Sequence, residues 1–153
     1  MKKLADSLYS FVVTLWIGGI WTIGYVVAPT LFSSLNDKQL AGSIAGNLFS
    51  VSGWVGIGCA SFLAVFLLSR HGVFALRLAV FWLLLLMLAL TLLSQFGLQP
   101  FIAHLKEGAL PSKVMESVVR DRFATWHGIA SMLYLLQSVL GLALLLKAER
   151  ARS

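Results

Sequence analysis

Hydrophobic residues fill four long stretches of this chain, and the short segments between them hold its charge. No Asp, Glu, Lys or Arg occurs in residues 8–35, 39–69, 78–103 or 123–146. A helix needs about 20 mostly apolar residues to cross a bilayer, and it closes its own backbone hydrogen bonds. The regular polar and apolar alternation that a membrane β-barrel requires is missing from these stretches.

The pattern therefore predicts an all-α, polytopic membrane protein built as a four-transmembrane-helix bundle. We expect one domain that covers residues 1–153. The predicted spans cover approximately residues 8–34, 44–69, 76–100 and 122–146.

Composition agrees with this class, because 59% of the residues are hydrophobic and 12% are charged, far from the average of soluble domains. An N-terminus in the cytoplasm would place seven basic residues inside and five outside, as the positive-inside rule favours. The seven are Lys2, Lys3, Arg70, Arg77, Lys147, Arg150 and Arg152. We therefore expect a multi-pass protein of the bacterial inner membrane with both termini cytoplasmic. Its net charge of +6 would face anionic lipid headgroups of the bilayer, and no nucleic-acid partner is expected.

Small residues recur at intervals of four in two runs of the second span. They are Gly42 and Gly46, then Ser52, Gly56, Ala60 and Ala64. This spacing keeps them on one side of a helix, where a neighbouring helix can approach closely. Close packing is likewise expected at the glycines of the first span, which are Gly18, Gly19 and Gly24.

Prolines and a polar segment predict where helices bend or end. Pro29 lacks a backbone N–H and should bend or end the first helix near its outer face. The segment 104–122 is the only sizeable polar loop, and the third helix should end between Pro100 and His104. Nothing from residue 112 to residue 146 forbids one continuous helix, which would project a few turns out of the membrane.

His127 stands near the start of the fourth apolar stretch, within RDRFATWHGIASMLY. At about 100° per residue, one face of that helix carries a polar stripe. The stripe consists of Glu116, Arg120, His127, Ser131, Tyr134 and Ser138. At about 1.5 Å per residue, His127 lies roughly 30 Å from Lys147, at the outer edge of the apolar region.

The other three spans offer polar side chains at the same depth, and such groups tend to face one another inside a bundle. The first span brings Tyr25, the second Asn47, and the third carries Thr91, Gln95 and Gln99 on one face. The sequence thus predicts an outward-facing polar layer with a candidate ligand-binding set. That set is His127, Arg120, Tyr134, Gln95, Gln99, Tyr25 and Asn47.

Two interpretations of this layer remain open. Its side chains act either as interhelical hydrogen bonds that hold the bundle together, or as a shallow polar pocket for a ligand, ion or proton with His127 as the titratable member. The expected function is non-enzymatic binding of a partner or small ligand, and a membrane-protein partner or a homo-oligomer is compatible with it.

A haem- or metal-binding redox protein is the alternative, and the cofactor is left unknown. Two axial haem ligands must lie at the same depth on two helices that face each other. Only His104 and His127 lie on the outer side, and His104 falls in the loop. Copper favours thiolate or thioether ligands, but Met132 points away from the face of His127 and Cys59 lies deep in the inner half. Cys59, the single cysteine, is expected to be a small packed residue. A phosphate loop, a serine–histidine–acid set and paired carboxylates within the spans are all missing from the sequence.

Three segments carry a resemblance to a known family: WIGGIWTIGYVVAPTLFSSL, AGSIAGNLF and RFATWHGIASMLYLLQSVLGLALLL. Together they resemble the bacterial DUF4149 (TMEM205-like) family of integral membrane proteins over nearly the whole chain. The resemblance implies a small four-span inner-membrane protein without an established activity. The matching polar or bend-forming residues are Pro29, Phe32, Gly42, Gly46, Phe123, His127 and Gly128.

A looser similarity, in size and number of spans, links the chain to two other families. These are the CopD-like copper-resistance domain and the membrane-bound protoporphyrinogen oxidase of the haem pathway. The chain lacks the histidine that the oxidase family carries in its first span, which argues against a haem enzyme.

Overall fold

The computed structural model describes residues 2–98, 100 and 113–150, and every regular element in these ranges is helical. Side chains are described for these residues except 2, 38, 39, 98, 113–124, 126, 127 and 148–150. The first apolar stretch forms α1 (Lys2–Trp21), the π-helix η1 (Thr22–Val27) and α2 (Ala28–Ser34) without a break. The second stretch forms α3 (Lys38–His71), which the short 3-10 helix η2 (Gly72–Arg77) connects to the third. The third comprises α4 (Ala79–Leu92) and the π-helix η3 (Leu93–Leu98), and the fourth is α6 (Lys113–Arg150).

Four helical segments are long and apolar enough to cross a membrane. They are Lys3–Ser34, Leu40–Arg77, Ala79–Gly97 and Gly128–Lys147. The predicted all-α fold with four membrane-spanning helices is confirmed, and the chain is a multi-pass membrane protein.

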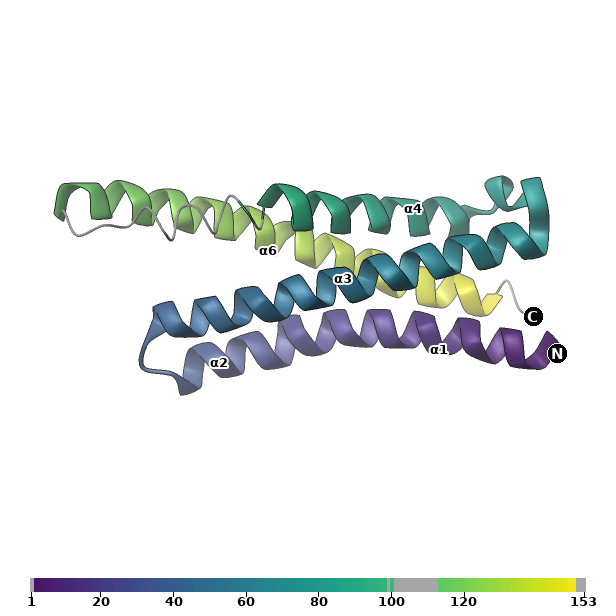
Figure 1. Cartoon of the computed structure of the whole chain (residues 1–153), viewed down its shortest axis with the longest axis horizontal. Coiled ribbons are helices and arrows are strands. Elements are labelled where there is room, and N and C mark those ends of the chain that lie inside the picture. The colour runs from purple at the N-terminus through teal and green to yellow at the C-terminus, as the bar shows by residue number, and fades with distance from the viewer. Residues whose placement is uncertain (1, 99, 101–112, 151–153) are drawn as a thin grey trace.

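The helices lie side by side in an up-and-down arrangement, with α1 antiparallel to α3 and α4 antiparallel to α6 (Figure 1). Both chain ends and the turn between α3 and α4 lie at one end of the bundle, called here the terminus end. The turn between α2 and α3 lies at the opposite, distal end. The helix α6 is continuous, as predicted, and its first turns extend beyond the α2–α3 turn (Figure 1). Residues 101–112, with much of the predicted polar loop, lie outside the described residues.

Local chemistry explains both turns. Asp37 caps the start of α3, because its Oδ1 accepts the backbone N–H of Leu40 at 3.1 Å, a bond that satisfies one of the unpaired donors of the first turn. At the other end of α3, Gly72 has φ +56°. This left-handed conformation, which glycine adopts without a Cβ penalty, ends the helix and directs the chain into η2.

Pro29 does not end the first helix, which continues to Ser34. The disturbance instead appears on its N-terminal side as the π-helix η1, at whose end the N–H of Ala28 donates to the carbonyl of Ile23, five residues back. A proline cannot donate a backbone hydrogen bond, and its ring crowds the carbonyl four residues earlier. The wider π-turn makes room for the ring without breaking the helix.

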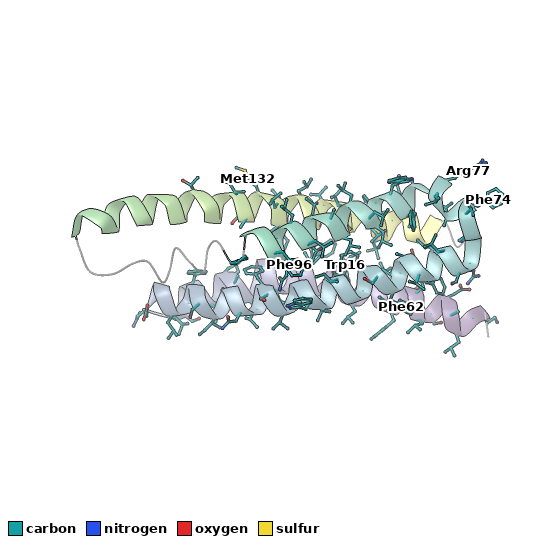
Figure 2. The ribbon with its side chains drawn as sticks, turned by 45° about the horizontal axis from the view of Figure 1, so that its top comes forward. Trp16, Phe62, Phe74, Arg77, Phe96 and Met132 are labelled. Atoms are coloured by element: carbon teal, nitrogen blue, oxygen red, sulfur yellow. The ribbon has the colours of Figure 1, made fainter. Side chains whose placement is uncertain are left out.

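The core lies where α1, α3, α4 and α6 meet. Buried residues on α1 follow helical steps, and their stripe contains Tyr9, Val13, Trp16, Ile17 and Ile20. The largest fully buried side chains of the other helices are Leu63, Leu84, Met87 and Leu144. Figure 2 shows the labelled Trp16 in the middle of the bundle, whereas Phe62 and Met132 point outward.

The small-residue seam of α3 is confirmed in its middle. Gly56 is buried, and a Cβ built there would lie 2.7 Å from the indole Nε1 of Trp16. Ala60, one turn further, is fully buried. At the distal end, Ala41 and Ala45 are more deeply buried than Gly42 and Gly46, so the contact face is rotated there by one residue.

The glycines of the first span behave differently from one another. A Cβ at Gly24 would overlap the ring of Tyr134 on α6, so close packing at this position is confirmed. A Cβ at Gly18 or Gly19 would have no atom within 4 Å among the described residues, so the expected close packing at these two positions is wrong. The buried stripe of α1 explains the difference, because Gly24 continues it one turn after Ile20, whereas Gly18 and Gly19 fall beside it.

Two glycines of α3 provide a matched test of the seam. We expect Gly56→Leu to destabilise the bundle by about 1–3 kcal/mol, because the new side chain must displace Trp16 or move α1 away. The control is Gly58→Leu, since Gly58 is exposed with no atom within 4 Å of its Cβ position. The measurement is reversible unfolding in mixed micelles. Equal stability of the two variants would show that the Trp16 contact does not limit packing.

Candidate functional site

The phenol of Tyr134 joins α6 to the first helix in the distal half of the bundle. Its hydroxyl donates a hydrogen bond to the backbone carbonyl of Ile20, and its ring lies against the backbone of Gly24. In an α-helix the carbonyl of residue 20 would accept the N–H of residue 24. The Tyr134 hydroxyl thus inserts between backbone hydrogen-bonding groups at the start of η1. A side chain inserted in this way is a known cause of helix distortion.

Glycine at position 24 makes this approach feasible. The ring of Tyr134 occupies the space that any side chain at Gly24 would need. On its other side the ring meets Phe49 of α3 in an edge-to-face arrangement, with 5.1 Å between the ring centroids. Such pairs contribute about 0.5–1.5 kcal/mol beyond their buried area. One side chain of α6 therefore contacts both α3 and the first helix.

The third span joins the same level through Gln95. Its Nε2 donates to Oγ of Ser50 at 3.0 Å and to the carbonyl of Ser50 at 3.3 Å. The amide lies directly over Gly53, where a Cβ would overlap its Oε1. Because Ser50 follows Phe49 in the chain, the Gln95 and Tyr134 contacts lie at one height on α3.

All four spans thus meet in what we call the distal polar layer, which consists of Gly24, Phe49, Ser50, Gln95 and Tyr134. Gly24 belongs to η1 and Gln95 to η3, so both π-helices of the described chain lie at this layer. Short π-helical segments occur frequently at functional sites, because they cost backbone regularity and persist where the surroundings require them. Sequence reasoning did not predict either of them.

A second polar contact lies about one helical turn nearer the terminus end. Gln137 of α6 donates through Nε2 to Oγ1 of Thr91 at 2.6 Å, and Thr91 donates to the carbonyl of Met87 at 2.8 Å. Gln137 and Thr91 are buried, with exposed fractions of 8% and 5%. Thr91 was expected in the layer, but Gln137 was missed. The signal was available, because Gln137 lies three residues after Tyr134 and seven before the buried Leu144, on one helix face.

The predicted ligand-binding residues divide into three groups. Tyr134 and Gln95 lie in the distal polar layer and make hydrogen bonds across the bundle. Tyr25, with 51% of its surface exposed, and Asn47 lie on the outside of the bundle. Gln99 and the side chains of Arg120 and His127 lie outside the described residues.

Chemically, the described layer offers neutral hydrogen-bond donors and acceptors. Among the described residues, no three His, Cys, Asp or Glu side chains are grouped as a metal ion would require. Cys59 is buried with 8% of its surface exposed, as expected of a packed residue. Met132 is 75% exposed and points away from the bundle (Figure 2).

Comparison with known proteins identifies one family. The family model described as "Domain of unknown function (DUF4149)" matches residues 11–111. This range covers most of the first span and all of the second and third, and it ends before α6. Pro29, Phe32, Gly42 and Gly46 therefore fall inside it, and Phe123, His127 and Gly128 fall beyond it. No curated protein and no solved structure matches the chain.

A double-mutant cycle tests the Gly24–Tyr134 contact. We expect Gly24→Ala to destabilise the bundle by about 1–3 kcal/mol through overpacking, and Tyr134→Phe to cost about 0.6 kcal/mol as one lost membrane hydrogen bond. Gly24→Ala should cost much less when combined with Tyr134→Ala, because the overlapping ring is then gone.

Gly18→Ala is the control for helix propensity, since a Cβ at Gly18 meets open space among the described residues. Unfolding in mixed micelles gives the four free energies of the cycle, those of the wild type, Gly24→Ala, Tyr134→Ala and the double variant, and Tyr134→Phe is measured beside them. Strict additivity of the two substitutions would contradict a direct contact between Gly24 and Tyr134.

Proposed function

Since the chain belongs to the DUF4149 family, whose function is not known, we propose that it is a non-enzymatic membrane protein that binds a partner or a small ligand at its distal polar layer. The observation that carries this proposal is the meeting of all four spans, with both π-helices of the described chain, at one level. Short π-helical segments are frequent at functional sites, and two of them at one level support a binding role for this level.

The position of the layer supports access from the distal side. The sequence places His127 at the outer edge of the apolar region, and Tyr134 follows seven residues deeper, about 10 Å at 1.5 Å per residue. Asn47, two residues before the Phe49 that touches Tyr134, lies still nearer that edge. A ligand would need to enter only one or two helical turns.

Tyr25 and Asn47 are the residues that such a ligand or partner would meet first. Both side chains are exposed, and lipid offers them few hydrogen-bond partners below the headgroups. A polar group supplied by a bound molecule would satisfy the amide and the phenol. His127, Arg120 and Gln99 are included in the proposed site, because the sequence places them at the same depth or just above it.

The proposed location is the bacterial inner membrane, with both termini in the cytoplasm and the distal end outside. Its support is the excess of basic residues predicted for one side, together with the grouping of both termini and the α3–α4 turn at one end of the bundle (Figure 1). The predicted result is that a reporter fused after Ser153 is inactive if it requires export. An active exported reporter would reverse the orientation and place the layer on the cytoplasmic side.

Site-specific photocrosslinking tests the binding proposal. A photoreactive phenylalanine analogue at position 47 should form a defined adduct with a protein or small molecule in native membranes, whereas the same analogue at position 65 should label lipid only. Val65 is a matched control, because it is exposed on the same helix and lies 18 residues from Asn47, which is about five full turns and hence the same face.

The adduct is identified by mass spectrometry of the intact protein and of its peptides. Identical labelling at positions 47 and 65 would show that the distal half of α3 faces lipid alone, and would remove the proposed site. The visible absorption spectrum of the purified protein tests the redox alternative, since a Soret band would identify bound haem and overturn the non-enzymatic assignment.

A further inference from the structure

We propose that the turn between α3 and α4 binds the headgroup of an anionic phospholipid, and that Arg77 is its principal contact. This surface lies at the terminus end of the bundle, away from the distal polar layer, and does not depend on the function proposed for that layer. Four observations carry the proposal: the exposed apolar tip of the turn, the difference between its two arginines, a tryptophan that holds the turn, and the charge of this end.

The turn presents apolar side chains outward. Val73, Phe74 and Leu76 are 79%, 69% and 46% exposed, whereas Ala75 between them is fully buried. Ala75 therefore anchors the turn to the bundle while its neighbours extend outward. At the end of a membrane-spanning helix, exposed apolar side chains of this kind lie at the boundary between acyl chains and headgroups.

Arg77 and Arg70 have different electrostatic surroundings. Arg70 forms an ion pair with Asp6, and its guanidinium lies 5.9 Å from the centroid of Phe66. Arg77 stacks over the ring of Phe74 at 5.5 Å, and no acidic side chain in the described part of the chain pairs with it. Figure 2 shows Phe74 and Arg77 together at this end of the bundle. Arg77 thus retains a positive charge that an external anion can neutralise.

Trp82 holds the turn in place. Its indole Nε1–H donates to the carbonyl of Leu76 at 2.9 Å, while 60% of the residue is exposed. Tryptophan side chains with one polar and one apolar edge concentrate at the membrane–water boundary. This hydrogen bond fixes the peptide group between Leu76 and Arg77. The backbone that carries the Arg77 side chain is therefore held in place.

This surface matches the chemistry of a phospholipid on both sides. A planar guanidinium can donate two parallel hydrogen bonds to phosphate oxygens, and the exposed Phe74 and Val73 offer apolar contact for the glycerol and upper acyl region. The segments of this end carry seven basic residues against the two acidic residues Asp6 and Glu149. A free phosphate ion would use the charge but not the apolar tip, so we assign the surface to a lipid.

Native mass spectrometry of the full chain in detergent tests this assignment. With phosphatidylglycerol and phosphatidylcholine of identical acyl chains, the wild type should retain phosphatidylglycerol preferentially. Arg77→Gln should weaken that binding about fivefold, the equivalent of one basic side chain near an anionic surface. Arg70→Gln, which removes the same charge from the same end, should have little effect because Asp6 already neutralises Arg70.

Phe74→Ala keeps the net charge and should also weaken binding, since it removes the ring over which Arg77 is held. This variant decides the matter if Arg77→Gln does not fold. Three outcomes would overturn the proposal: no preference of the wild type for the anionic lipid, equal losses in Arg70→Gln and Arg77→Gln, or unchanged binding in Phe74→Ala. Equal losses in the two arginine variants would show that the lipid is attracted by the overall positive charge of this end and not by a site at Arg77.

Discussion

The contact between the Tyr134 ring and the backbone at Gly24 determines how the distal half of this bundle is built. Lipid supplies no hydrophobic drive that would bring helices together, so close contact and hydrogen bonding must do so. A ring can touch a helix backbone only where a side chain is missing, and Gly24 provides that space. The hydroxyl then reaches the carbonyl of Ile20, and the edge of the ring meets Phe49. The Tyr134 side chain thus contacts the first helix and α3 from α6, and η1 begins near the carbonyl that its hydroxyl reaches.

The two ends of the molecule are stabilised by different physics. The described distal contacts are made by neutral groups in an apolar region, where an ionised side chain would be expensive. At the terminus end, Asp6 and Arg70 form an ion pair with partly exposed side chains, and Tyr9 lies against Phe66 with a centroid separation of 5.3 Å. Exposed ion pairs contribute at most about 1 kcal/mol. The aromatic packing and the buried stripe of α1 therefore hold this end, and Arg77, which has no acidic partner among the described residues, is available for the membrane surface.

Hydropathy alone predicts the four helices, because the lack of hydrogen-bond partners in lipid leaves the chain few alternatives. Which face of each helix packs against its neighbours is harder to predict from the sequence. Gly18, Gly19 and Gly24 are chemically identical, and only the stripe that ends at Ile20 shows that Gly24 faces the neighbours. Gln137 could have been found by extending the stripe from Tyr134 towards Leu144. The π-helices are harder to find, since both stretches are apolar on most sides and hide the one-residue shift that a π-turn introduces, and Pro29 signals a disturbance without fixing its form.

The distal polar layer can serve both as a structural clamp and as a binding site, because its hydrogen bonds end largely on the backbone. Tyr134 donates to the carbonyl of Ile20, and Gln95 donates partly to that of Ser50. These carbonyls stay in place whatever the side chains do, and each has a second lone pair. A bound molecule that replaced the Tyr134 or Gln95 donor at its carbonyl would also have to accept a hydrogen bond from the displaced hydroxyl or amide, so that no buried group is left unpaired. An anion could not make this exchange, because it offers no donor to the carbonyls. The described part of the proposed site therefore suits a neutral ligand that both donates and accepts hydrogen bonds.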